Sequence, residues 1–419
     1  MKKGIKIFAV CAVLCIALSL SAFAANFEHC ADALKELDLF RGTNNGYELD
    51  REAMRSEAAT MLVRLLGAEG EAMKLSYTAP FTDVDDWLKP YVQYLYDKGL
   101  TKGTSATTFG STMKCESQQY TTFLLRALGY VDGEDFTYNT ADGFGEKVGV
   151  VDRFNTFVRG AEFLRDNIVA MSWTALSLPT KQGDATLLSK LVADGAIADA
   201  KGYDAYLESY RAAMEAISAF SVSPVKTIRE VATVDVTYGG ALNSRNIQTI
   251  ETIIENRAKI SSKGEQKLIP YESGKLSSGA FQVLPIEFYY SDGFVYGISN
   301  GEKLREKASF DDALGNISVN TIRYADIPVS AVIRAESGAL FEYAPVALKG
   351  ELAVGSGIDS VAVSVETSGK ALSKITAKVS EKTTKDGTAV GLASTLTGEY
   401  SLGGTVTMPA DLASYKETK

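Results

Sequence analysis

The stretch of sequence that decides the fold is residues 81–130, FTDVDDWLKPYVQYLYDKGLTKGTSATTFGSTMKCESQQYTTFLLRALGY. Its apolar residues recur at intervals of three and four, which predicts two short helices joined by a glycine-rich loop. The apolar faces are Leu88, Tyr91, Val92 and Leu95, then Tyr120, Phe123, Leu124, Ala127 and Leu128. We expect Asp83 or Asp85 to cap the first helix and Gly99 and Gly129 to end the two helices. Helices this short need copies of themselves to bury their apolar faces.

The chain contains such copies. The hexapeptide at 62–67, LVRLLG, matches LLRALG at 124–129, an offset of 62 positions (126 − 64). A weaker third copy runs from Phe163 to Leu176. Repetition on this scale indicates an array, and we place its units at about 27–68, 81–130 and 136–196. Arg64 and Arg126 lie opposite the apolar faces, so we expect both to be solvated.

These residues resemble the S-layer homology (SLH) family. The second repeat carries the family's opening element in Phe81-Thr82-Asp83-Val84 and Trp87, followed by Gly99 to Gly103 and Phe109. The family's Thr-Arg-Ala-Glu element corresponds to Met54-Arg55-Ser56-Glu57, Glu116-Ser117-Gln118-Gln119 and Leu164-Arg165-Asp166-Asn167. The resemblance covers roughly residues 27–196.

The resemblance implies an all-α, pseudo-threefold module that holds cell-wall polysaccharide on a Gram-positive-type surface. A guanidinium can bind a carboxylate of an anionic glycan, such as a pyruvylated one, and an indole can stack on a sugar ring. The candidate glycan-binding residues are Arg55, Glu57, Asp83, Trp87 and Arg165. Because Ser117 has no charge, we expect at most two working grooves. A purely structural role is the alternative, with Arg55 paired to Glu57 or Glu52 and Trp87 in the core.

Residues 1–24 are typical of a secretory signal, with three lysines, an apolar run at 7–20 and Ala22-Phe23-Ala24 as cleavage site. The run is too short for a transmembrane anchor. Without it, 40 basic residues (43 − 3) face 52 acidic ones, a charge of −12, which argues against nucleic acid as a partner. The tail, 411–419, carries no Leu-Pro-x-Thr-Gly sorting signal, so the repeats are the expected means of retention at the cell wall.

Residues that carry chemistry are scarce. His29 is the single histidine, which argues against serine or cysteine nucleophiles and zinc sites, and we expect it at the surface. No cofactor and no metal site are predicted. Cys30 and Cys115 are too few for a disulfide scaffold, and both two buried thiols and one bridge remain open. Carboxylate-pair hydrolysis also remains open.

The second half of the chain has a different pattern of apolar and polar residues. We expect a helix at 185–194, capped by Asp184, to end the helical module. Residues 196–202 are the predicted linker. An amphipathic helix at 203–220 is then the first element of a second domain, 203–419. Beyond residue 221 the apolar period becomes two. Hairpins are predicted at Ser291-Asp292-Gly293 and Lys385-Asp386-Gly387, with a further strand at 303–308, a strand pair at 231–238 and 361–366, and a strand within 248–260. The expected class is α+β, with an antiparallel sheet of eight or more strands.

The order of an amphipathic helix and then a strand meander resembles the LolA-like lipoprotein-carrier fold, a curved unclosed barrel around a helix. The resemblance implies an apolar cavity, for which Tyr289, Phe294 and Tyr296 are candidate lining residues. Ordinary core packing of these residues is the alternative.

Two functions follow from these patterns. The first is a non-enzymatic surface protein whose repeats bind wall polysaccharide and whose β-rich domain binds a lipid, peptide or protein. The second is an exported wall-active hydrolase that uses carboxylates. A degenerate repeat module that mediates only protein contacts is a further alternative.

Overall fold

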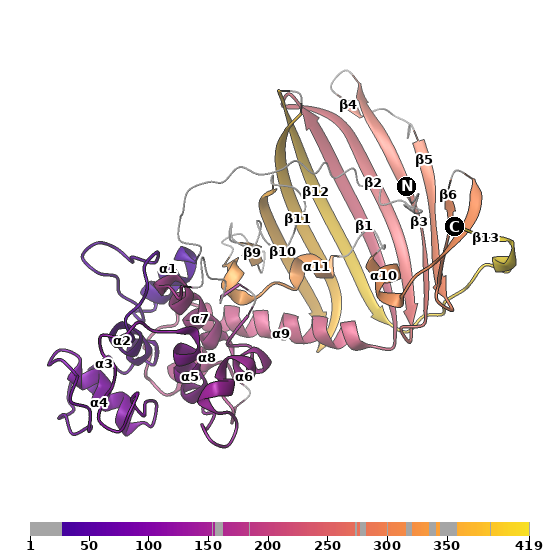
Figure 1. The fold of residues 1–419 in the computed structure, drawn as a ribbon. Coiled ribbons are helices and arrows are strands. Elements are labelled where there is room, and N and C mark those ends of the chain that lie inside the picture. The colour runs from indigo at the N-terminus through magenta and orange to yellow at the C-terminus, as the bar shows by residue number, and fades with distance from the viewer. Residues whose placement is uncertain are drawn as a thin grey trace.

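The structure of this chain, a computed structural model, describes residues 27–152, 154–155, 162–183, 185–272, 275–276, 282–299, 301–315, 321–334, 341–343, 358–385 and 387–418. The expected secretory signal lies outside the described residues, as do Asp184 and Asp386. A helical part comes first and a broad open antiparallel sheet follows, which is the expected α+β class (Figure 1).

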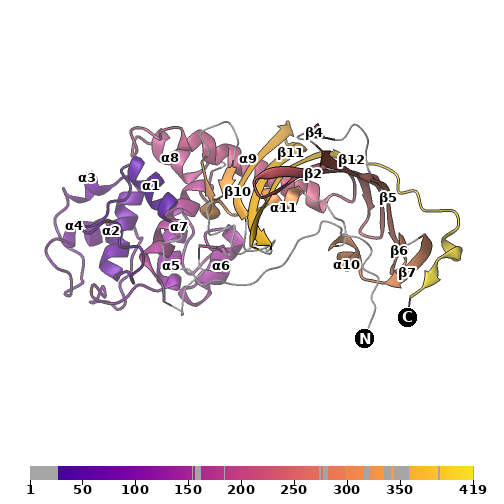
Figure 2. The same cartoon turned by 90° about the horizontal axis from the view of Figure 1, so that it is seen from above.

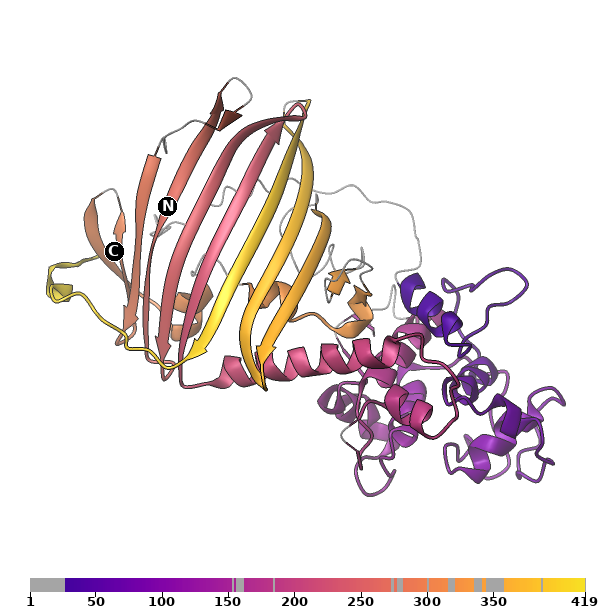
Figure 3. The ribbon, with the colours of Figure 1, turned by 180° about the vertical axis from the view of Figure 1, so that it is seen from behind.

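Short helices joined by long loops build the helical part. Their bounds are α1 Glu28–Glu36, α2 Arg55–Leu65, α3 Glu69–Ala72, α4 Lys89–Asp97, α5 Ser117–Ala127, η1 Tyr138–Thr140, α6 Ala141–Val148, α7 Arg165–Ser177 and α8 Leu187–Ala193. The expected stops after α4 and α5 are present, because Gly99 and Gly129 have φ of 68° and 90°. Thr186 caps α8 by accepting the N–H of Ser189 at 3.1 Å. The longer α9, Tyr203–Val222, leads to the sheet (Figure 3).

The predicted cap of α4 is wrong, and Asp83 has another role. Among the described residues, no side chain accepts a hydrogen bond as a cap of this helix. Instead, Oδ1 of Asp83 accepts the N–H of Phe109 at 2.7 Å, and Oδ2 accepts those of Gly110 at 2.7 Å and Ser111 at 3.3 Å. Asp83 therefore fixes the glycine-rich loop that joins α4 to α5.

The second helices of two repeats dock onto the loop of another repeat. At the start of α2 the N–H of Arg55 donates to the carbonyl of Met113 at 2.8 Å, and at the start of α7 that of Arg165 donates to Arg51 at 3.0 Å. The two acceptors are 62 positions apart (113 − 51), the offset between the first two repeats. The second helix of the first repeat thus packs on the loop of the second, and that of the third packs on the loop of the first.

One segment of the sheet part reaches back to the helices. Nε2 of His29 lies 2.8 Å from the carbonyl of Ser330, whose hydroxyl donates to Asp152 at 3.1 Å. The phenol of Tyr210 on α9 donates to the carbonyl of Ile327 at 2.7 Å. His29 is therefore not a free surface residue as expected, and burial lowers its pKa to about 4. Both expected domains contribute to this contact.

The cysteines of the described part are buried and free. The Cys30 thiol lies 3.5 Å from the Ser330 carbonyl, at the same contact between the two parts, whereas Cys115 precedes α5. Of the two alternatives, the structure has two buried thiols.

Long strands form a 13-stranded sheet of the described residues. The strands that carry the argument are β1 Val225–Tyr238, β2 Ala241–Glu255, β3 Lys259–Glu272, β5 Gln282–Ser291, β6 Phe294–Ser299, β7 Glu302–Lys307, β10 Ile358–Ser368, β11 Ala371–Lys385 and β12 Thr388–Leu402. Shorter ones are β4 Lys275–Leu276, β8 Val332–Ile333, β9 Phe341–Tyr343 and β13 Lys416–Glu417. The order is β13-β7-β6-β5-β3-β2-β1-β12-β11-β10-β9-β8, and β13 runs parallel to β7.

The predicted hairpins β5–β6 and β11–β12 are present, and β7 confirms the further strand. Residues 248–260 form the end of β2, a turn and the start of β3. The strands at 231–238 and 361–366 exist but do not pair with each other, because β1 lies between β2 and β12, and β10 lies between β9 and β11.

Helices cover one face of the sheet. Figure 2 shows the sheet bent into an arc with α10, Phe310–Gly315, and α11, Ile322–Ala325, inside it. Phe220 of α9 packs edge-on against Tyr400 of β12 with ring centroids 5.1 Å apart, and Phe310 packs against Tyr290 at 5.7 Å. This covered face is the concave face.

A buried carboxyl group lies on the concave face. Oε1 of Glu230, on β1, accepts the N–H of Thr321 at 2.7 Å and its hydroxyl at 3.1 Å. The Thr321 hydroxyl also bonds the phenol of Tyr400. Glu230 is 3% exposed, and burial raises its pKa to about 7 although the Thr321 bonds lower it. This carboxyl group ties α11 to the sheet.

Removing the Asp83 carboxylate should destabilise the helical part. Asp83→Ala leaves three loop N–H groups without their acceptor, and we expect a loss on the order of 2 kcal/mol in the free energy of unfolding. Asp85→Ala is the matched control, because no described residue bonds to the Asp85 side chain. Urea unfolding checks both variants, and equal losses would contradict the role of Asp83.

Glu230 should make folding stability fall as pH rises. An unfolded glutamate has a pKa of about 4.3, so between that pH and about 7 the unfolded state loses the proton that the folded state keeps. Stability contributed by this group is therefore full below about pH 4.3, and about 4 kcal/mol of it is lost by pH 8. The Glu230→Gln variant lacks this titration. In unfolding experiments from pH 4 to pH 8, the free energy of unfolding of Glu230→Gln should rise relative to that of the unmodified protein. A difference between the two proteins that stays constant with pH would contradict this prediction.

Candidate functional site

A cavity of about 320 Å³ lies between the second helices of the first two repeats. Helices α2 and α5, the loop after α4 and the start of η1 supply its walls. The lining residues are Arg55, Lys102, Gly103, Thr104, Gln119, Thr122, Phe123, Arg126, Asp132 and Tyr138. We call this cavity the Arg55 groove.

Arg55 is the central side chain of the groove and is only 5% exposed. Its Nε donates to the Phe109 carbonyl at 2.9 Å, and its Cζ lies 5.0 Å from the ring centre of Phe109 and 4.9 Å from that of Phe123. It forms no ion pair with a carboxylate of the described residues. Burial and, more weakly, the positive charge of Arg126 lower its pKa. The guanidinium is therefore held by one nitrogen, without a counter-ion.

Arg126 and Lys102 add positive charge to the same cavity. Nη2 of Arg126 and Nζ of Lys102 both pair with Oδ2 of Asp132, at 2.8 and 3.0 Å. The Nε atom of Arg126 is buried and has no hydrogen-bond partner among the described residues. The groove is thus lined by three cations and one carboxylate, a formal charge of +2 (3 − 1). The expectation that Arg126 is solvated is wrong, since its side chain is 11% exposed.

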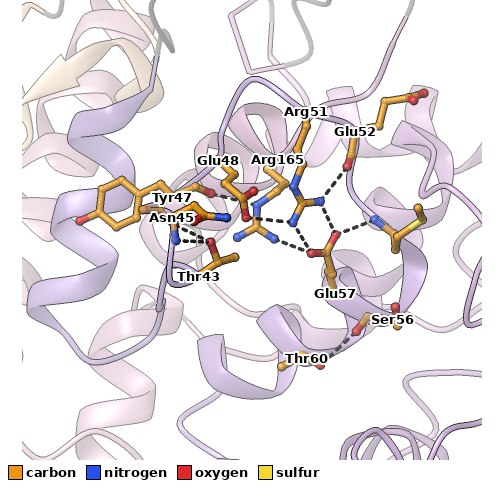
Figure 4. A network of polar contacts seen from close by, with 12 residues as sticks. Thr43, Asn45, Tyr47, Glu48, Arg51, Glu52, Ser56, Glu57, Thr60 and Arg165 are labelled. Carbon is orange, nitrogen blue, oxygen red and sulfur yellow. Dashed lines mark hydrogen bonds and ion pairs between the residues drawn. The ribbon is translucent and has the colours of Figure 1, made fainter.

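The arginine of the third repeat is in a different state. Nε of Arg165 donates to the Tyr47 carbonyl at 3.0 Å, and Tyr47 and Phe109 are 62 positions apart (109 − 47). Nη1 of Arg165, however, pairs with Oε1 of Glu57 at 3.2 Å, and Arg51 donates to both oxygens of that carboxylate at 2.6 and 2.9 Å (Figure 4). Arg165 is therefore already neutralised by the chain itself.

Glu57 also closes the first turn of its own helix. Its Oε2 accepts the N–H of Met54 at 2.9 Å, as the side chain of Asn167 accepts that of Leu164 in the third repeat. Burial opposes its ionisation, but the bonds from Arg51 and Met54 and the charge of Arg165 leave its pKa lowered. Glu57 is thus an ion-pair partner and a cap.

The remaining candidates lie apart from the guanidinium groups. Asp83 is behind the loop that carries the Phe109 carbonyl. Trp87 precedes α4, is 54% exposed and does not line the Arg55 groove. Ser117, at the arginine position of the second repeat, carries no charge, and its hydroxyl lies 3.5 Å from Asp142.

The predicted apolar lining is on the other face of the sheet. Tyr289 lies opposite Tyr296 across β5 and β6, and both pack with Tyr415 of the C-terminal segment, with Phe294 partly buried beside them. Their neighbour Tyr290 has the opposite orientation and joins the concave-face cluster. Tyr289, Phe294 and Tyr296 therefore form a small core on the outer face, where they do not line a cavity enclosed by the helices.

Of the residues that line the groove, the sequence analysis predicted a ligand role only for Arg55. The charged and long polar residues that it missed are Lys102, Gln119, Arg126, Asp132 and Tyr138. One signal was available: Gln119 stands 62 positions after Glu57 (119 − 57), so an amide replaces an acid at one repeat position. Of the described residues, no three or more His, Cys, Asp and Glu side chains gather into a possible metal site. Nor is any described helix long and apolar enough to span a membrane.

Comparison with solved structures gives weak similarity. LprF from Mycobacterium bovis matches with a TM-score of 0.24 and 13% identity, over 48% of this chain and 96% of that one. A DUF1329 family protein from Desulfovibrio piger matches with a TM-score of 0.15 and 12% identity, over 46% and 90%.

Comparison with known sequences gives matches over part of the chain. The middle cell wall protein of Brevibacillus brevis is 31% identical over 109 residues, and the surface layer protein of Brevibacillus choshinensis is 30% identical over 109. An endoglucanase from Bacillus sp. is 31% identical over 122 residues. Each match covers 25% of this chain but only 10–13% of the relative. The S-layer homology domain model matches residues 80–110. This chain therefore carries an S-layer homology repeat.

Proposed function

We propose that this chain is a non-enzymatic cell-surface protein that its helical repeats anchor, without a covalent bond, to an anionic polysaccharide of a Gram-positive-type cell wall. The β-rich part is then displayed to bind a lipid, peptide or protein. The observation that carries the proposal is the Arg55 guanidinium, which is buried at a cavity and has no carboxylate partner in the part of the chain that the structure describes.

A charged group in this state favours an external anion. Burying a charge is costly unless it is paired, and the described residues offer Arg55 only the Phe109 carbonyl and two aromatic rings. A glycan carboxylate can accept two parallel hydrogen bonds from a guanidinium. The pairing would supply the missing counter-ion.

Local charge supports the same class of ligand. The whole chain has a formal charge of −9, whereas the groove carries +2. A wall anion is therefore attracted to this cavity more than to the rest of the protein. Partial similarity to cell-wall and surface-layer proteins is consistent with that location.

Of the predicted residues, we assign direct glycan contact to Arg55 only. Asp83 holds the loop, and Arg165 is already paired with Glu57. Trp87 is exposed on the adjoining repeat and remains available to a sugar ring of the same polymer.

The alternative function is an exported wall-active hydrolase with the repeats as its targeting module. The similarity to an endoglucanase favours it, but that match covers a quarter of this chain and 13% of the relative. A hydrolase needs two carboxyl groups facing one sugar linkage. Incubating the chain with purified sacculi tests this alternative: we expect no release of reducing sugar, and release above that from heat-inactivated protein would favour the enzyme.

Retention on the wall should depend on Arg55 and not on Arg165. With protein-free sacculi, Arg55→Ala in the mature chain should reduce the retained fraction at least tenfold, because the loss of a charge-assisted pair costs about 1.5–3 kcal/mol. Arg165→Ala is the matched control at the equivalent position. Its retained fraction, corrected for any unfolded protein, should change less than twofold. Unchanged retention of Arg55→Ala, or an equal loss in both variants, would contradict the assignment.

A further inference from the structure

The aromatic residues around the Arg55 groove differ in what their rings can still contact. Phe109 and Phe123 are buried, and Cζ of Arg55 lies 5.0 and 4.9 Å from their ring centres. Tyr138 lines the same cavity but is 41% exposed. Among the described aromatic residues at this groove, Tyr138 is therefore the one whose ring a ligand can reach.

The chain around Tyr138 is fixed against the helices. Phe136, two residues earlier, is buried. Nε2 of Gln118, on α5, donates to the Tyr138 carbonyl, and Oγ1 of Thr140 accepts the N–H of Thr137 at 3.0 Å. A ligand that packs on a side chain of such a segment has little backbone freedom to remove, which lowers the cost of binding.

This aromatic residue stands where the preceding repeat has an acid. Phe136-Thr137-Tyr138 corresponds to Phe81-Thr82-Asp83, and the phenylalanine of each tripeptide is buried. The Asp83 carboxylate holds the loop of its own repeat, whereas Tyr138 lines the groove between α2 and α5. Burial raises the pKa of the Tyr138 phenol, but the positive charge of Arg55 lowers it, so the two groups lie close together.

We propose that Tyr138 is a positioning residue for the glycan, and that its ring packs against the sugar unit whose carboxylate binds Arg55. A phenol ring offers a flat apolar face to the C–H groups of a sugar, and its hydroxyl can bond a sugar hydroxyl. The inference rests on the proposed function and deepens it, because it names the residue that orients the bound sugar. One groove then combines side chains from all three repeats.

The position of Trp87 gives it a different role. The sequence predicted this indole as the partner of a sugar ring, but Trp87 does not line the Arg55 groove. Its ring can therefore meet only another unit of the polymer, whereas Tyr138 shares the cavity with Arg55.

The first test measures retention on protein-free sacculi, corrected for any unfolded protein. Tyr138→Ala in the mature chain should reduce retention on the order of fivefold, because it removes the ring face. Tyr138→Phe keeps that face and should restore most of the retention. Tyr96→Ala is the matched control, because Tyr96 is 42% exposed on α4 and does not line the groove; its retention should not change.

The second test observes the contact itself. With polysaccharide released from sacculi, nuclear Overhauser effects should join the ring protons of Tyr138 to C–H protons of the sugar, and none should involve Tyr96. Their absence from Tyr138 in the bound state would overturn the inference, as would equal losses of retention in Tyr138→Phe and Tyr138→Ala.

The two proposals fail in different ways. If Arg55→Ala loses retention while Tyr138→Ala keeps it, the proposed function stands and the role of Tyr138 is wrong. If Arg55→Ala has no effect on retention, the proposed function itself fails.

Discussion

The packing of each second helix on the loop of the neighbouring repeat is the constraint on which the rest of the structure depends. One guanidinium nitrogen of Arg55 or Arg165 completes this contact by donating to a loop carbonyl. A buried arginine has five N–H donors in a fixed plane, so the same side chain can fix the loop and still present its far edge to a ligand. In the proposed function, the residue that fixes the loop is therefore also the one that binds the glycan.

The helical part and the sheet contact each other directly and are not joined by a linker alone. Helix α9 packs against α7 and α8 at one end and against strands β10 and β11 at the other, and Ser330 reaches back to His29 and Asp152. Polar groups buried in such a contact hold it in one arrangement, because each would lose its partner if the parts separated. A wall-bound helical part would thus fix the direction in which the sheet is displayed.

The sequence patterns predicted the helices and the hairpins, because each depends on local periodicity or on a short turn motif. They failed where the outcome depends on distant segments. Asp83 has the composition of a helix cap, yet the loop 26 residues later (109 − 83) offers it better donors. Tyr289 and Tyr296 alternate correctly along their strands, but a period of two cannot tell which face the helices cover. Arg126 looked solvated because helical periodicity says nothing about the neighbouring loop that encloses it.

The central claim is that Arg55, and not Arg165, receives the wall anion. The most direct test is an NMR titration of the isotope-labelled chain without residues 1–24. The arginine Nε resonances are followed while polysaccharide released from sacculi is added. The account predicts a saturable shift of the Arg55 resonance with that of Arg165 unchanged. A shift of Arg165 alone, or of neither resonance at saturating polysaccharide, would contradict it.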